Sequence, residues 1–286
     1  MPYDWVVQSG SGPGSTSSST HAVRDQPAGR RRQAADCRIA PSPYGTELAA
    51  RVMEDRMFIG HFAVGMAARP LAPKASLGTL FLAAQFIDLL WPTLLLLGIE
   101  QVRIEPGITA MTPLDFIHYP VSHSLLAVLG WAVALALAYF AIRRERREAL
   151  VLGLLVVSHW LLDALVHRPD LPLFPGDSPR VGLGLWQSVP GTLAVELSLL
   201  AAGVWIYLRT TEARDSTGRW ALYGLVAFLL LIYASNVLGP PPPSVEAIAW
   251  VGHAQWLLVA WGYWVDAHRQ IRFPAAARYS PGRATQ

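Results

Sequence analysis

Hydrophobic side chains fill long, nearly continuous blocks of this chain, separated by short polar segments. The blocks begin near Met57 and continue to about residue 266. Because the hydrocarbon core of a bilayer is about 30 Å thick, about 20 helical residues are needed to cross it. A shorter apolar block at 57–68 predicts a half-helix, a short tilted span or an extension of an amphipathic helix. The longer blocks predict six transmembrane helices, at 76–98, 122–142, 148–167, 189–209, 219–239 and 245–266.

The composition favours the same class of protein. Of the 286 residues, 52% are hydrophobic and only 15% are charged, whereas soluble globular chains carry about 25% charged residues. This scarcity of charge excludes an ordinary soluble enzyme and predicts an all-α, polytopic transmembrane helix bundle. The single cysteine, Cys37, excludes an internal disulfide and a thiolate metal cage.

The first 56 residues differ from the rest of the chain. Gly, Ser, Thr and Pro dominate the stretch from Ser9 to Thr20, and three arginines follow at 30–32. Such a segment buries too little apolar surface to fold, so residues 1–56 are predicted to be a disordered tail. The segment has no apolar core typical of a signal peptide. We expect the native protein to start at Met57 or Met53, the alternative being a basic regulatory tail.

Positive charge is distributed unequally between the two sets of predicted loops. The loops at 69–75, 143–148 and 210–219, together with the C-terminal tail, hold about a dozen Lys and Arg residues. The other set holds three, Arg103, Arg168 and Arg180. Because cytoplasmic loops are enriched in Lys and Arg, the first set and the tail at 269–286 are predicted to be cytoplasmic, which leaves residues 57–268 as the transmembrane domain.

The net charge of +3 is explained by the same distribution. The basic residues cluster at the ends of apolar segments, which suits membrane orientation better than a phosphate-binding surface. We therefore expect the lipid bilayer as a partner and no nucleic acid.

Ionisable side chains inside the apolar blocks are the strongest functional signal. Such groups are costly in a membrane and usually face a protein interior or a water-filled cavity. Most of them fall in the exterior half of the predicted spans, so we expect them to converge there. They are His61, Asp88, His123, His159, Asp163, His167 and Glu196, with Asp115, His118 and Asp170 just outside the blocks.

The spacing of these residues suggests metal chemistry. His159 and Asp163 are four residues apart and therefore share one face of a helix. Ligands one turn apart, joined by ligands from facing helices, are typical of metal sites in helical bundles. Imidazole and carboxylate suit zinc, manganese or iron, and the lack of thiolates argues against a closed structural zinc site. Together with His118, His123 and Glu196, these residues predict a site for one to three divalent ions.

Two alternative roles fit the same residues. A transporter would use them as a proton or cation relay, and a non-catalytic membrane scaffold would use them as hydrogen-bonding partners between helices. His253 fits the scaffold role, because its predicted span contributes nothing else to the cluster. His167 and Asp170 are expected to cap a helix end or to support the metal ligands. The same role is expected of Asp115.

Several motifs resemble the YdjM-like inner-membrane family, whose members are described as membrane-bound metal-dependent hydrolases. They are the stretch from Met57 to Gly65, the segment Gln85-Phe86-Ile87-Asp88, His118 with Ser122-His123-Ser124, and His159 with Asp163. The resemblance covers about 57–266. It implies a bacterial inner-membrane protein with His61, Asp88, His123, His159 and Asp163 as candidate metal ligands. The order of these residues is also similar to that in zinc-dependent phospholipases C and P1-type nucleases.

Taken together, the sequence predicts a membrane-bound metal-dependent hydrolase with an exterior-facing site and zinc as the expected ion. The reaction is hydrolysis of a phosphoester, ester or amide, and a lipid or another amphiphile is the expected substrate class. Asp163 and Glu196 are the candidate catalytic groups. The predicted ligands are His61, Asp88, His118, His123, His159 and Asp163.

Overall fold

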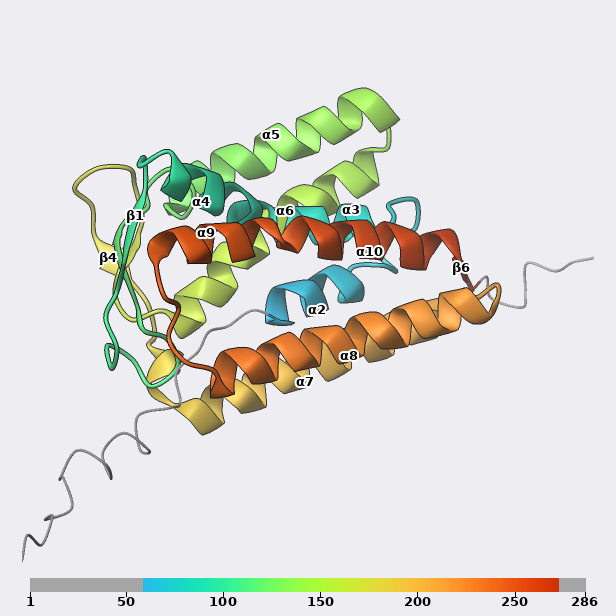
Figure 1. Ribbon diagram of the computed structural model, residues 1–286. Helices are drawn as coiled ribbons and strands as arrows, with labels where there is room; N and C mark the ends of the chain where they lie inside the picture. The colour runs from blue at the N-terminus through green and yellow to red at the C-terminus, as the bar shows by residue number, and fades with distance from the viewer. Residues whose placement is uncertain (1–58, 273–286) are drawn as a thin grey trace, which may run out of the picture. The chain divides into compact units, whose positions relative to one another are not determined.

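The computed structural model describes residues 59–272, so the tail predicted at 1–56 lies outside the described residues. The described part is mainly helical, as expected (Figure 1). Its α-helices are α2 (Ile59–Ala67), α3 (Leu77–Ala84), α4 (Phe86–Leu96), α5 (Leu125–Arg143), α6 (Arg146–Val166), α7 (Val189–Thr210), α8 (Ser216–Leu238), α9 (Val245–His253) and α10 (Gln255–Ala267).

The connections contain short antiparallel strand pairs that the all-α prediction did not include. They are β1 (Gln101–Ile104) with β2 (Leu114–His118), β3 (Leu171–Pro172) with β4 (Arg180–Val181), and β5 (Thr211–Ala213) with β6 (Arg269–Ile271). The strands lie between apolar blocks or, for β6, after the last block, and a strand of two to five residues leaves little periodicity to detect. The pairing of β6 with β5 also ties residues 269–271, predicted as the start of a tail, to the end of α7.

Within residues 59–272, four helices, α5 to α8, are long and apolar enough to cross a membrane. The pair α3 and α4 would be a fifth span if it crosses as one unit, since the two helices meet at an angle of 55°. This number is smaller than the six predicted spans. The difference arises because the predicted spans at 76–98 and 245–266 are each broken, at Gln85 and at Ala254.

The two broken pairs pack side by side, α3 against α10 and α4 against α9. Gly252 of α9 permits the second contact, because a Cβ atom there would lie 2.5 Å from Cγ of Pro92. Pro92 lies within α4 and has no backbone N–H to donate. The two broken pairs therefore run alongside each other, with the break at Gln85 in one and the break at Ala254 in the other.

The short helix α2 lies in the centre of the described bundle rather than beside it. It contacts α7, α3, α6 and α8. Gly203 of α7 permits the closest of these contacts, since a Cβ atom there would lie 2.3 Å from the carbonyl oxygen of Ala63. The apolar block at 57–68 is thus a buried half-helix within the described residues, one of the three forms that its length predicted.

Side-chain caps explain where several helices begin. Ser124, Ser188, Asp215 and Ser244 precede α5, α7, α8 and α9, and each accepts a hydrogen bond from a backbone N–H of the first turn. Such caps satisfy N–H groups that have no partner within the helix.

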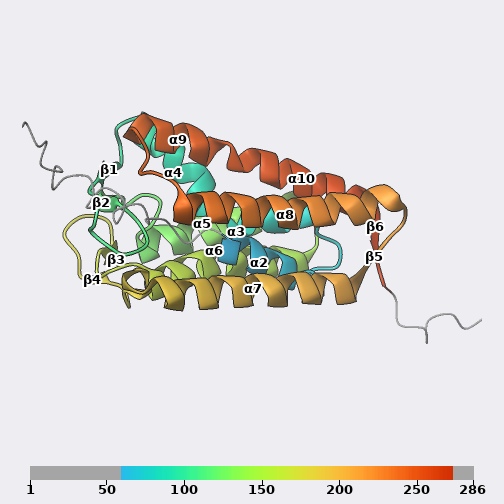
Figure 2. The ribbon, with the colours of Figure 1, turned by 60° about the horizontal axis from the view of Figure 1, so that its bottom comes forward.

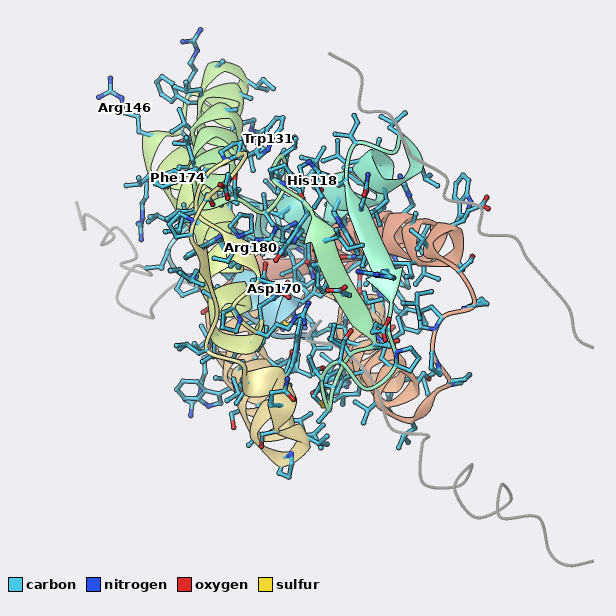
Figure 3. The ribbon with its side chains drawn as sticks, turned by 90° about the vertical axis from the view of Figure 1, so that its left-hand side faces the viewer. His118, Trp131, Arg146, Asp170, Phe174 and Arg180 are labelled. Atoms are coloured by element: carbon cyan, nitrogen blue, oxygen red, sulfur yellow. The ribbon has the colours of Figure 1, made fainter. Side chains whose placement is uncertain are left out.

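The loops that are rich in Lys and Arg and the loops that are poor in them lie at opposite ends of the bundle. Strands β1 to β4 gather at one end, whereas the turn between α5 and α6 and the pair β5–β6 lie at the other (Figures 1 and 2). Figure 3 looks onto the first end and shows His118 and Arg180 there, with Arg146 labelled on the α5–α6 side. The grouping agrees with the predicted alternation of loops, and the assignment of one end to the cytoplasm stays a prediction.

Candidate metal centre

Five of the six predicted ligands meet in the interior of the bundle. His61 comes from α2, Asp88 from the first turn of α4, His123 from the segment before α5, and His159 with Asp163 from α6. Their nitrogen and oxygen atoms form two groups that can hold a metal ion. The groups are His61, Asp88 and His159, and His123, His159 and Asp163, with ligand atoms within 4.8 Å of one another in each.

The distances between these atoms suit a shared ion better than direct hydrogen bonds. Nε2 of His159 lies 3.3 Å from Oδ2 of Asp163 and 3.5 Å from Oδ1 of Asp88. Nε2 of His123 lies 3.8 Å and 3.6 Å from the same two oxygens. Hydrogen bonds of this type are about 2.7–3.2 Å long. Ligands bound at about 2.1 Å in a tetrahedron lie about 3.4 Å apart, which matches these separations.

Buried atoms without partners mark the same position. Nε2 of His159 and Oδ2 of Asp163 have no hydrogen-bond partner, although both are inaccessible to solvent. Leaving a buried polar atom unpaired costs about 1–3 kcal/mol, so native structures seldom contain two together. A divalent ion would satisfy both atoms at once.

The ring of His159 is oriented by its other nitrogen. Nδ1 of His159 lies 2.8 Å from the carbonyl oxygen of Ala84. A carbonyl oxygen only accepts, so Nδ1 carries the proton and donates it, which leaves the lone pair of Nε2 directed at the cluster. This is the arrangement that metal-binding histidines commonly adopt.

His123 is oriented through a two-step chain. Its Nδ1 lies 2.6 Å from Oγ of Ser122, and this hydroxyl donates to Oε2 of Glu100 at 2.5 Å. The other oxygen of Glu100 accepts hydrogen bonds from the backbone N–H groups of Val121 and Ser122. Because the serine proton is given to the carboxylate, Ser122 accepts from Nδ1, and Nε2 of His123 faces the cluster as its available ligand atom.

His61 completes the cluster by stacking on His159. The two imidazole rings are 3.9 Å apart and inclined by 9°, and Nε2 of His61 lies 3.3 Å from Oδ1 of Asp163. Asp163 therefore faces His61 with one oxygen and His123 and His159 with the other, which makes it the central carboxylate.

Asp88 is the most accessible member of the cluster. Its side chain is 23% exposed, compared with 7% for Asp163 and 1% for His159. A cavity of about 370 Å³ adjoins the cluster and is lined by His61, Asp88, His123 and Asp163. The cluster is therefore closed on most sides and reachable from this cavity.

Glu196, predicted as a catalytic group, has a structural contact at the start of α2. One of its carboxylate oxygens accepts a hydrogen bond of 2.7 Å from the backbone N–H of Gly60. The residue is fully buried and is not among those that line the cavity. It thereby fixes the N-terminus of the helix that presents His61, where a negative charge is favourable.

His118, the sixth predicted ligand, lies apart from the other five. It is the last residue of β2, where it pairs with Gln101 and is exposed on the surface (Figure 3). It belongs to neither group of candidate ligands. Strand β2 places His118 away from the cluster. The sequence predicted a loop at this position and did not indicate the strand.

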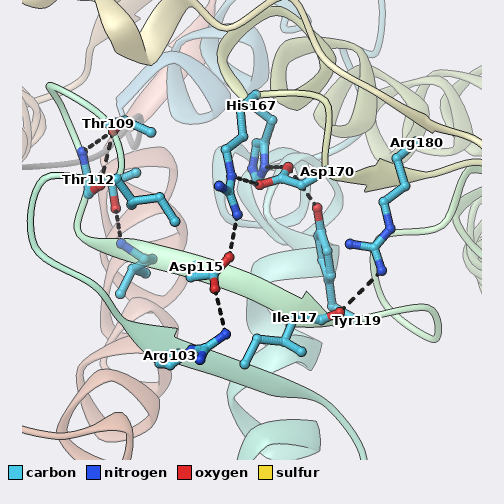
Figure 4. Close-up of polar contacts among 12 residues, drawn as sticks. Arg103, Thr109, Thr112, Asp115, Ile117, Tyr119, His167, Asp170 and Arg180 are labelled. Atoms are coloured by element: carbon cyan, nitrogen blue, oxygen red, sulfur yellow. Dashed lines mark hydrogen bonds and ion pairs between the residues drawn. The ribbon is translucent and has the colours of Figure 1, made fainter.

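The remaining predicted residues form a second polar network beside the cavity (Figure 4). Nδ1 of His167 lies 2.9 Å from Oδ1 of Asp170, which also accepts a hydrogen bond from the hydroxyl of Tyr119 at 3.1 Å. Arg168 donates to Asp170 through Nε at 2.9 Å and also pairs with Asp115. His167 ends α6, as the helix-end prediction stated, and its side chain also lines the cavity.

The electrostatics of this network follow from burial and pairing. Burial raises the pKa of Asp170, but the hydrogen bonds and charges of His167 and Arg168 outweigh that effect and hold the pKa below its ordinary value. Burial raises the pKa of the Tyr119 hydroxyl, and the adjacent Asp170 carboxylate raises it further. Asp170 is therefore a carboxylate and Tyr119 a hydrogen-bond donor at neutral pH.

Two residues that orient the ligands were not predicted. Glu100 lies in a loop as a single acidic residue, and nothing in its neighbourhood in the sequence links it to Ser122. The carbonyl of Ala84 takes part only because α3 ends there, and a break in an apolar block is hard to detect from composition. A polar residue in such a block, Gln85, was the available signal.

The five side chains fit a divalent cation, because their orienting partners and their unpaired buried atoms leave ligand atoms facing the cluster. These nitrogen and oxygen atoms suit zinc or manganese. Comparisons with family models, with curated proteins and with solved structures found no match to this chain.

Proposed function

We propose that this protein is a membrane-embedded, metal-dependent hydrolase. The single observation that carries the proposal is the convergence of His61, Asp88, His123, His159 and Asp163 from separate segments, with buried atoms of His159 and Asp163 left without a hydrogen-bond partner. Structural hydrogen bonding alone would pair these atoms with each other or with the backbone. The resemblance to the YdjM-like family supports the same conclusion.

The residues of the chain have distinct roles in this proposal. His123, His159 and Asp163 hold the ion, and His61 joins them beside Asp163. When bound, a divalent ion polarises a phosphoryl or carbonyl oxygen and lowers the pKa of a water molecule. Asp88, the most exposed member of the cluster, accepts the proton of the attacking water. His167 contributes a polar atom to the cavity wall, held in orientation by Asp170.

Metal analysis of purified protein tests the first half of the proposal. Wild type purified in detergent should retain zinc or manganese at near-stoichiometric amounts, whereas His159→Ala and Asp163→Ala should lose it. His118→Ala is the matched control, because His118 is exposed and outside the cluster. Equal, near-zero metal in all four proteins would rule out the metal-dependent hydrolase and favour the non-catalytic scaffold.

Hydrolysis is tested on the metal-loaded protein. Release of phosphate, headgroup or fatty acid from mixed bacterial lipids should depend on added metal and should fall strongly in Asp88→Asn. Retained metal with no release from any phosphoester, ester or amide substrate would contradict the enzymatic role.

A second candidate function is transport of a cation or proton. It is favoured by one specific observation, the breaks at Gln85 and Ala254 in two helix pairs that pack against each other, because interrupted helices are typical of transporter sites. Asp88 lies one turn beyond the first break. Metal uptake into proteoliposomes, measured alongside hydrolysis, separates the two functions, since a hydrolase turns over substrate without moving the ion.

A further inference from the structure

The cavity beside the metal-ligand cluster has two chemically different parts. Its polar part is formed by the cluster and by His167. Its other part lies among α8, α9 and α10 and is lined mainly by apolar side chains, including Phe228, Ile232, Ile248, Leu258 and Trp261. In the described residues no charged side chain lines this apolar part, which contains two uncharged amides, Asn236 and Gln255. An uncharged, largely apolar ligand group therefore fits it.

The cavity is closed at the end that carries the loops. Thr112, Leu114, Phe116 and Trp186 line it there together with His167. All five residues are buried, and the ring of Trp186 lies 4.2 Å from that of His167. A ligand does not reach the cluster directly from the water at this end of the bundle.

The exposed part of the cavity wall lies on the side of the bundle. Phe228 of α8, Val251 of α9 and Leu257 of α10 line the cavity, yet they are 39%, 68% and 71% exposed. They mark a mouth between α8 and the α9–α10 pair. Because α8 is long and apolar enough to cross a membrane, this mouth faces the hydrocarbon of a surrounding bilayer.

We propose that the apolar part of the cavity, here called the chain-binding chamber (Phe228, Ile232, Ile248, Leu258 and Trp261), binds one hydrocarbon chain of an amphiphile that enters sideways from the bilayer. The polar group of the amphiphile then lies at the His/Asp cluster. The whole cavity, with its polar part included, has a volume of about 370 Å³, near the lower limit for ligand pockets, so its apolar part holds a single chain rather than two. The inference rests on the proposed function only for the reaction at the polar group. Binding of the hydrocarbon chain in the chain-binding chamber does not depend on that reaction.

Photocrosslinking in lipid nanodiscs tests the chamber. The probe is a diazirine analogue of palmitic acid, activated by light and mapped to residues by mass spectrometry. Wild type should be labelled at chamber residues of α8 and α10 more strongly than at Leu137 and Leu161, two exposed apolar positions that report general lipid contact. Excess unlabelled palmitic acid should suppress the chamber labels and leave those at the reference positions.

A matched pair of variants on α8 makes the test specific. Ile232→Trp places a bulky ring in the chamber and should reduce chamber labelling by about tenfold. Leu231→Trp adds the same side chain one residue away, at a position that is 62% exposed and outside the cavity, and should leave the labelling unchanged. Thermal unfolding of both variants checks that each is folded.

The outcomes separate this inference from the proposed function. Chamber labelling should persist after removal of metal with EDTA and in proteins that hydrolyse nothing, because hydrocarbon binding needs no ion. Two results would overturn the chain-binding chamber: labelling there no stronger than at Leu137, or a folded Ile232→Trp variant that is labelled like wild type. Neither result would bear on the metal-dependent reaction.

Discussion

Nδ1 of His159 lies 2.8 Å from the carbonyl oxygen of Ala84, the last residue of α3. That carbonyl is free to accept because the helix ends there, at the break before α4. The break therefore does more than bend an apolar segment, since it supplies the acceptor that orients a candidate metal ligand.

This contact predicts the protonation of the His159 ring. In the zinc-loaded protein its Nδ1 should carry a proton and its Nε2 should bind the ion, so the Nε2 resonance should shift when zinc is added. Nitrogen-15 NMR of histidine-labelled protein measures both, with His159→Ala to assign the signal. His253 is the internal control, because its Nδ1 lies 2.8 Å from the carbonyl of Ala249 but its Nε2 contacts Thr93. A ring protonated on Nε2, or zinc shifts confined to His253, would contradict the assignment.

Ser122 should strengthen metal binding although it touches no ion. Ser122→Ala removes the link between His123 and Glu100, and loss of such an orienting partner typically costs about 10- to 100-fold in metal affinity. Competition with a chromogenic chelator measures that affinity. Ser124→Ala is the control, since Ser124 caps α5 and its loss should lower stability by about 1 kcal/mol with metal affinity unchanged. Equal affinities in the two variants would contradict the role of Ser122.

The sequence predicted the metal-ligand cluster better than the path of the chain around it. His61, Asp88, His123, His159 and Asp163 were identifiable because ionisable side chains are rare and costly in apolar blocks. His118 was grouped with them because it is close to His123 in the chain, whereas β2 places it on the surface, apart from the other five. Glu196 is buried as expected of an intramembrane carboxylate, yet it holds the N-terminus of α2.

The helices were predicted well where they are continuous and poorly where they break. The blocks that became α5 to α8 agree with the structure within a few residues, because length and hydropathy suffice for a straight helix. The breaks at Gln85 and Ala254 lie in two helix pairs that pack against each other, for example through the contact of Gly252 with Pro92. Such contacts join residues more than 150 positions apart, and hydropathy along the chain does not report them.

Gly203 should control the position of His61. A Cβ atom at Gly203 would lie 2.3 Å from the carbonyl oxygen of Ala63, so Gly203→Ala forces α2 away from α7. We expect a loss of about 1–3 kcal/mol in stability, as for other overpacked sites, together with weaker metal binding. Thermal unfolding with and without zinc measures both effects.

Gly130→Ala provides the control for that prediction. Nothing lies within 4 Å of a Cβ atom built at Gly130 of α5, so helix propensity should make this variant slightly more stable, by about 0.5–1 kcal/mol. A Gly203→Ala protein as stable and as tightly metal-bound as wild type would show that α2 and α7 are not in close contact.

Asp170 should contribute stability that is lost in acid. The folded protein holds the pKa of Asp170 below its ordinary value, which is about 3.9 in an unfolded chain. The stabilisation is therefore complete above about pH 4 and disappears as the pH falls through the lower folded pKa. The difference in unfolding midpoint between wild type and Asp170→Asn should be largest near pH 7 and should shrink below about pH 4. Asp177→Asn, at an exposed position, should match wild type throughout, and a constant difference for Asp170→Asn would contradict the linkage.

The two ends of the bundle should lie on opposite sides of a membrane. Glu105 is exposed in the loop between β1 and β2, and Arg146 is exposed at the start of α6, at the other end. The charge distribution of the loops predicts that the end with Arg146 is cytoplasmic. In a Cys37→Ser background, Glu105→Cys should react with a membrane-impermeant maleimide in intact cells, whereas Arg146→Cys should react only after the membrane is permeabilised. Reaction of both cysteines in intact cells would contradict the spanning arrangement, and the reverse pattern would place the metal-ligand cluster nearer the cytoplasmic side.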